Sequence, residues 1–351
     1  MDRGAAWHPD LVTGRLSEVL QFAARPVVNT LGDLDAYRGR PMAELFPAPR
    51  GVPEVTVRGR WQLPGLVSED LEFRSLHVPI ERKFRRRYQE EYRETHRVYA
   101  RRIRPRSAGA RPRLLYLHGY MQPETYIEEV ALLALMARLL DVEVIQMQFP
   151  YHGRRTPRGS RFSGELYWTA DLVRSVEALR QTVLDARTLL SVLLAQDSRP
   201  VGVVGLSLGG ALTASLLCLD ERFAFAIPLI AHMDLAALVA DAPVLGRMRR
   251  DLQSFGWGGE EFGAFVAAMG WYDLRPKLAA QQILVIAAAR DRFFDPSVVQ
   301  TMWKQWRKPA IHWYPSSHMG FLGHLPTALQ QMHAFLEQGT WARGMPRRRR
   351  S

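Results

Sequence analysis

The pentapeptide Gly205-Leu206-Ser207-Leu208-Gly209 constrains this chain more than any other feature. It follows the apolar run 201–204, which predicts a buried strand, and precedes the small-residue segment 210–217, which predicts a helix. In such a strand-to-helix turn the serine projects above the sheet, and the next backbone N–H helps to hold an oxyanion. The pattern therefore predicts a nucleophilic Ser207. The alternative is a glycine-rich turn with an incidental serine.

A nucleophilic serine needs a base to take its proton and a carboxylate to orient that base. The apolar run 283–289 leads to Asp291, as a buried parallel strand delivers an acid to the carboxyl edge of a sheet. The strand-like run 310–315 leads to a loop that carries His318. These positions predict Asp291 as the orienting acid and His318 as the base. His324, six residues later, is expected to be a surface or packing residue.

A histidine-glycine pair, His118-Gly119, ends an earlier apolar run. With this pair and the chain order serine, aspartate, histidine, the sequence resembles the alpha/beta-hydrolase superfamily. The resemblance implies an α/β fold, with a mostly parallel sheet of the eight-stranded type flanked by helices, a helical cap insertion and an N-terminal extension. It also implies an oxyanion hole formed by the N–H groups of Leu208 and Tyr120, with Met121 as the alternative to Tyr120.

The stretch 148–155 is similar to the proline-histidine-glycine-arginine turn of a little-characterised branch near the dienelactone-hydrolase-like and acetyl-xylan-esterase-like groups. Its His152, Arg154 and Arg155 are candidate substrate-binding residues, because guanidinium groups suit carboxylate or phosphate. The alternative is that these arginines anchor the loop after the strand.

The motifs and composition predict one catalytic domain with additions. Residues 1–65 are expected to be an N-terminal extension packed on the core, and 66–342 the catalytic domain. Within that domain, residues 231–282 are longer than a single connecting helix and rich in Met and Trp, which favours a cap insertion. An ordinary packed helical pair is the alternative. Residues 343–351 are expected to be a basic disordered tail.

Several function classes have little support in the composition. No apolar run approaches 18 residues and the N-terminus lacks a signal-peptide core, so a cytoplasmic location is expected. The single cysteine, Cys218, is predicted to be a buried packing residue. No metal-ligand spacing is present, so neither a metal nor a cofactor is expected.

The net charge of +12 is concentrated in two places. Residues 81–113 hold 13 Lys/Arg against four Glu, and the tail adds Arg347 to Arg350. Peripheral contact with an anionic membrane is one interpretation, and solvated surface charge is the other. Nucleic acid is not an expected partner, because no recognition motif accompanies the arginines. The sequence does not determine the oligomeric state.

These observations predict a serine hydrolase that cleaves carboxylic esters of small molecules or lipids through an acyl-enzyme. Two alternatives remain at this point. One is a lipid deacylase or acyltransferase at an anionic membrane surface, and the other is a non-catalytic binding protein on a hydrolase fold.

Overall fold

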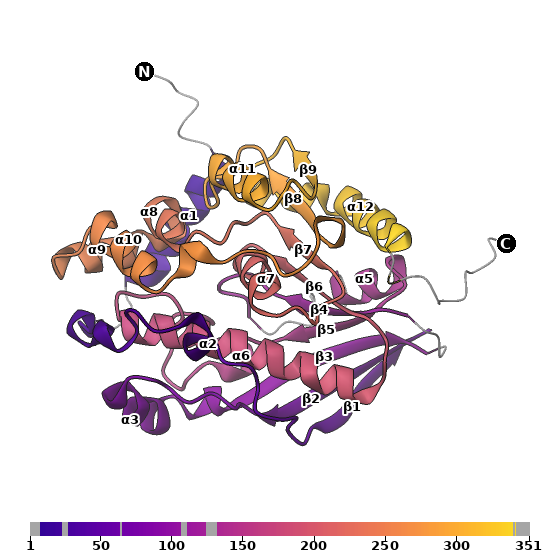
Figure 1. The fold of residues 1–351 in the computed structure, drawn as a ribbon, viewed down its shortest axis with the longest axis horizontal. Helices are drawn as coiled ribbons and strands as arrows, with labels where there is room; N and C mark the ends of the chain where they lie inside the picture. Colours follow the sequence, from indigo (N-terminus) through magenta and orange to yellow (C-terminus); the bar gives the residue numbers. More distant parts are fainter. Residues whose placement is uncertain are drawn as a thin grey trace.

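A computed structural model describes residues 8–22, 27–63, 65–106, 111–123, 132–339 and 341. These residues form one nine-stranded sheet in the order β1-β2-β3-β5-β4-β6-β7-β8-β9, with helices on both faces (Figure 1). The strands are β1 (Thr56–Leu63), β2 (Leu66–Arg74), β3 (Arg97–Pro105), β4 (Arg113–Leu117), β5 (Glu143–Met147), β6 (Val201–Leu206), β7 (Ala226–Leu229), β8 (Leu284–Ala288) and β9 (Ala310–Tyr314).

The helices divide into α-helices and short 3-10 turns. The α-helices are α1 (Pro9–Phe22), α2 (Met42–Leu45), α3 (Arg82–Glu91), α5 (Ala134–Leu139), α6 (Leu172–Gln196), α7 (Leu208–Leu219), α8 (Leu235–Asp241), α9 (Gly246–Ser254), α10 (Gly259–Ala268), α11 (Pro296–Gln305) and α12 (Leu325–Gln338). The 3-10 turns are η2 (Leu31–Ala36), η3 (Arg93–His96), η5 (Gly153–Arg155), η6 (Pro243–Leu245), η7 (Trp271–Asp273), η8 (Ala280–Gln282) and η9 (Met319–His324).

The sheet is mostly parallel, as expected. Strands β5, β4, β6, β7, β8 and β9 pair in parallel, and β1, β2 and β3 form an antiparallel edge joined to β5. The described sheet has one strand more than the eight-stranded type. This extra strand is β1, which lies in the segment expected to be an extension packed on the core, and it extends the sheet beyond β2.

Two hydrophobic layers sandwich the central strands, because alternate side chains of a strand point to opposite faces. In β4, Leu115 and Leu117 face the layer formed by α6 and α7, whereas Leu114 and Tyr116 face the layer formed by α5 and α12. Every residue of β4, β5 and β8 is buried. In α7, Cys218 is buried and its desolvation raises the pKa of the thiol to about 12, which agrees with a packing residue.

Helix α6 is buried on all sides along most of its 25 residues, including its charged positions. Its apolar spacing predicts one buried face, so the burial of its polar face is a departure from expectation. The N-terminal segment 30–47 and the segment around His77 cover that polar face and supply partners. Glu177 accepts a hydrogen bond from Tyr37 at 2.7 Å and lies 3.1 Å from His77. Although burial alone would raise it, the pKa of Glu177 is lowered to about 2, chiefly by Arg180.

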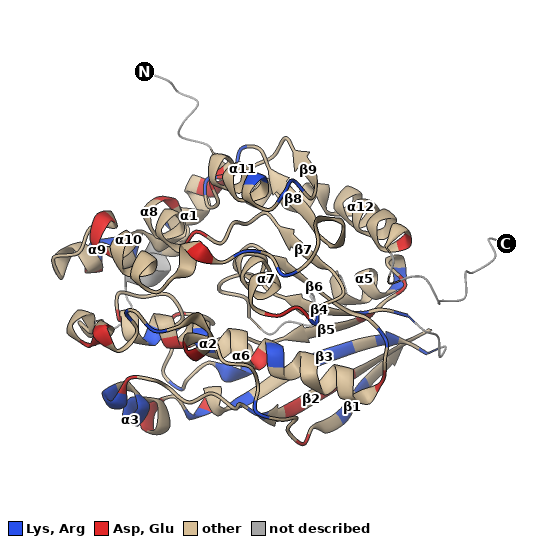
Figure 2. Cartoon of the chain, viewed as in Figure 1, with Lys and Arg blue, Asp and Glu red and all other residues tan. Residues whose placement is uncertain are grey.

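The basic segment 81–113 is largely paired within the fold. Figure 2 shows Lys/Arg and Asp/Glu side by side on β2 and β3, and a cluster of Lys/Arg on α3. The β3 pairs are Arg97 with Glu72 (2.7 Å), Arg101 with Asp70 (3.3 Å), and Arg102 (2.5 Å) and Arg104 (3.2 Å) with Glu69. This pairing favours surface charge balance over a free anion-binding face.

The Arg347 to Arg350 tail lies outside the described residues, so membrane contact stays a prediction. Among the described helices, none is long and apolar enough to cross a membrane.

Between β7 and β8 the chain forms α8, η6, α9 and α10, which Figure 1 shows gathered at one end of the molecule. This is the segment 231–282 expected to be a cap. Its buried apolar side chains, which include Leu238, Phe262 and Trp271, belong to the same hydrophobic layer as those of α6 and α7. The segment is therefore helical, as expected, and its relation to Ser207 follows from the site geometry.

Three histidines are fully buried near the carboxyl edge of the sheet. In His118, Nδ1 lies 2.8 Å from the Gly119 carbonyl oxygen and Nε2 accepts the Phe149 N–H at 3.1 Å, so the ring is neutral with its proton on Nδ1. Desolvation lowers the pKa of His118 and of His232 to about 4, and lowers that of His152 well below its usual range. These side chains are uncharged in the fold at neutral pH.

We expect acid to destabilise the protein through these buried histidines. Their folded pKa values lie below the unfolded value of about 6.5, so the unfolded chain binds more protons below that pH. Stability is full above about pH 6.5 and falls toward pH 5, by about 2 kcal/mol for each of His118 and His232. Urea unfolding at pH 7, 6 and 5 measures this loss. The substitution His232→Asn should reduce the pH dependence, and His333→Asn on α12, where the side chain is 43% exposed, serves as the control. A free energy of unfolding that stays flat from pH 7 to 5 would contradict it.

Candidate active site

Ser207 occupies a sharp turn between β6 and α7. Its backbone has φ 59° and ψ −119°, a conformation that non-glycine residues rarely adopt, and its N–H donates to the Leu229 carbonyl at 3.0 Å. The flanking glycines leave room for this turn. A Cβ on Gly205 would lie 2.0 Å from the Gly209 carbonyl oxygen, and one on Gly209 would lie 1.9 Å from the Leu117 carbonyl oxygen. The turn therefore requires glycine on both sides of the serine.

The predicted base, His318, and the predicted acid, Asp291, lie close to this serine, although they are 111 and 84 positions from it in the sequence. His318 Nε2 lies 2.9 Å from Ser207 Oγ, and His318 Nδ1 lies 2.8 Å from Asp291 Oδ2. His318 and Asp291 are both buried. Because parallel strands end at the same sheet edge, the loops after β6, β8 and β9 bring the three side chains into one hydrogen-bonded line.

The loop after Asp291 contacts both the predicted acid and the predicted base. Asp291 Oδ1 accepts the N–H groups of Phe293 at 2.7 Å and Phe294 at 2.9 Å. The Phe293 ring stacks on the His318 ring with centroids 4.6 Å apart, and the Phe294 ring lies parallel to it at 5.6 Å. One oxygen of the Asp291 carboxylate thus accepts hydrogen bonds from the backbone, and the other is bonded to the imidazole. The two phenylalanine rings restrict the orientation of the imidazole.

The predicted oxyanion donors lie at the same place. Leu208 is the first residue of α7, where backbone N–H groups have no intrahelical acceptor. Tyr120 and Met121 follow Gly119, whose Cβ position would lie 3.9 Å from Ser207 Cβ, and Met121 has φ 60°. Within the described ranges, the N–H groups of Leu208, Tyr120 and Met121 donate no hydrogen bond to another group of the chain. Tyr120 and Met121 therefore both remain candidates for the second donor.

An apolar cavity of about 380 Å³ opens at Ser207. Its walls come from helix α1, the 119–122 loop, the segment α8–η6, and the loops that carry Asp291 and His318. The apolar side chains that line it are Leu16, Met121, Leu206, Leu208, Ile230, Leu238, Ala242, Val244, Leu245, Phe293, Phe294, Met319 and Leu322. Part of the helical segment 231–282 thus forms one wall above the serine.

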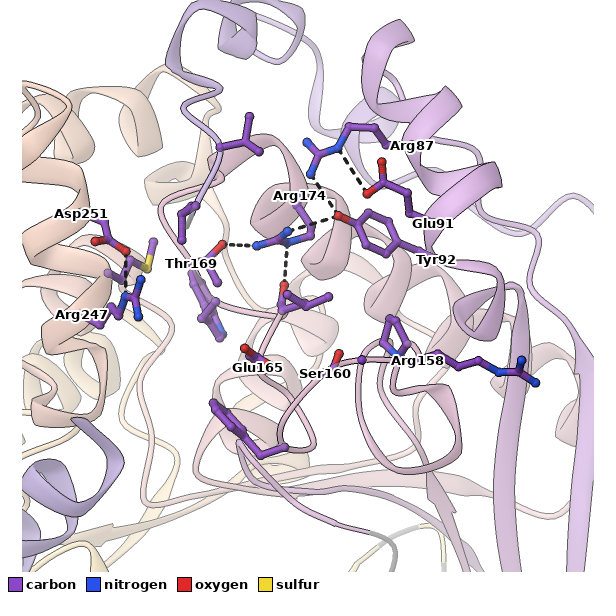
Figure 3. Close-up of a pocket in the computed structure, with 18 of the residues that line it drawn as sticks. Arg87, Glu91, Tyr92, Arg158, Ser160, Glu165, Thr169, Arg174, Arg247 and Asp251 are labelled. Carbon is purple, nitrogen blue, oxygen red and sulfur yellow. Dashed lines mark hydrogen bonds and ion pairs between the residues drawn. The ribbon is translucent and has the colours of Figure 1, made fainter. Parts of the chain in front are cut away.

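Figure 3 shows a second cavity, of about 440 Å³. It shares Tyr120 and Trp168 in its wall with the first. Its lining is less apolar than that of the cavity at Ser207 and carries side chains of both signs of charge. The charged side chains are Arg87, Arg158, Arg174, Arg247, Glu91, Glu165 and Asp251. Figure 3 shows Arg174 at the centre, where it donates to Tyr92 Oη at 3.3 Å, Thr169 Oγ1 at 2.7 Å and the Leu166 carbonyl at 3.0 Å.

The three candidate substrate-binding residues, His152, Arg154 and Arg155, form contacts within the fold and not in the cavity at Ser207. Arg155 is fully buried and pairs with Asp185 at 2.8 Å, and Arg154 pairs with Asp70 at 3.3 Å and covers the Tyr99 ring. His152 is buried among aromatic rings and donates from Nδ1 to the Pro150 carbonyl at 2.9 Å. None of the three lines the cavity at Ser207. The two arginines anchor the loop after β5, which is the alternative that the sequence left open.

Sequence reasoning missed the contribution of helix α1. Thr13, Leu16 and Ser17 line the cavity at Ser207, and Asp10 contacts the backbone of the His318 loop. Asp10 and His318 are 308 residues apart in the sequence, and no motif links them. No group of three or more His, Cys, Asp or Glu that could hold a metal ion occurs in the part of the chain that the structure describes.

The chain is similar to several solved structures. Acetyl xylan esterase 1 from Thermoanaerobacterium sp. is 18% identical with a TM-score of 0.57, and the match covers 87% of this chain and 98% of that one. An acetyl xylan esterase from Paenibacillus sp. is 15% identical with a TM-score of 0.56, over 90% and 98% of the two chains. At these identities the likeness concerns the fold.

Uncharacterised proteins from two strains of Mycobacterium tuberculosis are 31% identical over 206 residues, which is 57% of this chain. The match spans 47% of their length, so this chain corresponds to about half of the curated relatives it matches. Residues 114–346, about two thirds of the chain, match the family described as "Alpha/beta hydrolase family". The chain therefore belongs to the alpha/beta hydrolase family.

Proposed function

We propose that this protein is a serine hydrolase that cleaves carboxylic esters through an acyl-enzyme. The observation that carries the proposal is the hydrogen-bonded line from Ser207 through His318 to Asp291 at the floor of an apolar cavity. Nδ1 of His318 donates to the Asp291 carboxylate, which leaves Nε2 free to accept the Ser207 proton. This is the tautomer that a general base requires.

The reaction follows from these positions. As Ser207 Oγ forms a bond to the ester carbonyl carbon, its proton moves to His318 Nε2 and the carbonyl oxygen becomes an oxyanion. The N–H of Leu208 and that of Tyr120 or Met121 hold this oxyanion. His318 then gives its proton to the leaving alcohol oxygen as the C–O bond breaks. Water attacks the acyl-enzyme by the same steps, releases the acid and restores the serine.

The two cavities suggest where the acyl and the alcohol parts of an ester bind. The apolar cavity at Ser207 suits an acyl chain of moderate length, because each methylene buried there contributes about 0.8 kcal/mol. The second cavity, across Tyr120 and Trp168, carries charged side chains of both signs and suits a hydrophilic alcohol. Burial raises the pKa of the Tyr120 phenol, so its hydroxyl keeps its proton and serves as a donor at this junction.

The alternatives from the sequence receive less support. A lipid deacylase or acyltransferase at an anionic membrane rests on the basic segment 81–113, and the arginines of β3 in that segment pair with acids of this chain. A non-catalytic role gives no reason for the aligned Ser207, His318 and Asp291. The hydrolysis of carboxylic esters is therefore the function that the site supports best.

The substitution Ser207→Ala should leave a folded protein and lower kcat on any ester that the wild type hydrolyses by about 10⁴-fold or more, because the nucleophile is lost. A fluorophosphonate should label the wild type, Ser207 Oγ displacing fluoride from phosphorus, and should not label the variant. His318→Ala should be similarly inactive, whereas the matched control His324→Ala should keep most of the activity. Wild-type turnover by folded Ser207→Ala would overturn the proposal.

For the acyl site, kcat/KM on p-nitrophenyl esters should rise with acyl length by up to about fourfold per methylene until the cavity is full. Leu238→Trp, which narrows the cavity, should lower kcat/KM for long acyl chains more than for acetyl. Leu139→Trp, at an exposed position of α5, is the control for the added ring. Equal effects of Leu238→Trp on acetyl and long-chain esters would show that the acyl group lies elsewhere.

A further inference from the structure

A buried carboxylate from helix α1 joins the two loops that carry the acid and the base. Asp10 is fully buried. Its Oδ2 accepts the N–H groups of Arg292 at 3.0 Å and His318 at 2.9 Å, and its Oδ1 accepts the N–H of Met319 at 2.9 Å. Arg292 directly follows Asp291, so the three donors are the backbone of the two catalytic loops themselves.

These three N–H groups have no acceptor of their own nearby. His318 and Met319 begin the turn η9, where the first N–H groups of a helical turn lack internal acceptors, and no side chain of the turn itself caps it. A neutral side chain would give weaker bonds, because hydrogen bonds to a carboxylate are about twice as strong as those between neutral groups. Oδ2 alone joins the two loops and Oδ1 adds a third bond, so the carboxylate accepts three N–H groups, whereas one hydroxyl oxygen has only two lone pairs.

Helix α1 is closely packed where it delivers this carboxylate. A Cβ on Gly14 would lie 2.4 Å from Pro243 Cβ, so glycine is needed for the helix to approach η6. Ser17 Oγ donates to Met121 Sδ at 3.7 Å, which joins the helix to the loop of the oxyanion candidates. His8 Nδ1 lies 3.9 Å from Asp10 Oδ2. The helix therefore contacts the oxyanion loop, the helical segment above the serine and the base loop together.

We propose that Asp10 is a positioning residue of the active site, which holds the backbone of His318 so that both ring nitrogens keep their partners. The inference rests on the proposed function for its catalytic consequence. Asp10 touches no reacting atom. It acts through His318, whose Nε2 must stay 2.9 Å from Ser207 Oγ while Nδ1 stays 2.8 Å from Asp291.

The direct test compares Asp10→Ala and Asp10→Asn with the wild type, and uses Arg15→Ala, an exposed position on the same helix, as the control. Active serines are counted by fluorophosphonate titration, so that kcat refers to folded sites. We expect Asp10→Ala to lower kcat per active serine about 10- to 100-fold with little change in KM, because displacement of a catalytic group by about 1 Å costs up to roughly 10²-fold. Arg15→Ala should match the wild type.

Asp10→Asn gives the graded result, because it keeps the volume and one acceptor oxygen but turns an NH2 group toward at least one of the three N–H donors. It should lie between the wild type and Asp10→Ala in kcat, again with KM preserved. A merely structural role would reduce the number of active serines and leave kcat per site unchanged in both variants. That outcome would overturn the proposal. If Asp10→Ala does not fold, the Asp10→Asn comparison decides.

A second readout does not depend on the substrate. Hydrogen exchange of the peptide 315–322 should speed up in Asp10→Ala and stay unchanged in Arg15→Ala, because two of its amides lose their acceptor. If the wild type neither hydrolyses esters nor reacts with fluorophosphonate, the proposed function fails, but this exchange still tests whether Asp10 holds the His318 loop. Unchanged exchange in folded Asp10→Ala would overturn the positioning role.

Discussion

The hydrogen bond between His318 Nε2 and Ser207 Oγ depends on the parallel alignment of β6, β7, β8 and β9. Each of these strands delivers its loop to the same edge of the sheet, so residues more than 100 positions apart meet there. The glycines at 205 and 209 then let the chain turn sharply enough for Ser207 to face the imidazole. Without this shared edge, Ser207, His318 and Asp291 would not lie within hydrogen-bond distance of one another.

The centre of the fold and the line of Ser207, His318 and Asp291 could be anticipated from the sequence. Both depend on local signals: continuous apolar runs for buried parallel strands, and small residues around a serine for the turn. The same logic placed Asp291 two residues after the apolar run 283–289, and His318 three residues after the strand-like run 310–315.

Features that depend on contacts between distant segments could not be anticipated. The polar stripe of α6 resembles a solvated face, yet Tyr37 and His77 from remote segments cover it and satisfy Glu177. Strand β1 lies in the segment 1–65, which was expected to be an extension packed on the core and instead adds a strand to the sheet beside β2. Asp10 offers no local pattern either, since its partners are backbone N–H groups about 300 residues away.

The partners of the arginines also depend on contacts between distant segments and could not be anticipated. A cluster of 13 Lys/Arg in residues 81–113 suggested an anionic partner, but charge counts do not show which acids lie across a strand pair. The acids Glu69, Asp70 and Glu72 of β2 lie beside the arginines of the neighbouring strand β3. Arg155 was a candidate substrate-binding residue because of the motif in which it lies. Its charge is likewise neutralised by Asp185 on buried α6.

The most direct test of the central claim is mass spectrometry of the intact protein quenched during turnover of a slowly hydrolysed ester. The account predicts a mass increase equal to the acyl group, located by peptide mapping on Ser207 and absent from Ser207→Ala. An ester that is hydrolysed with no acyl adduct on Ser207, or with the adduct on another residue, would contradict it.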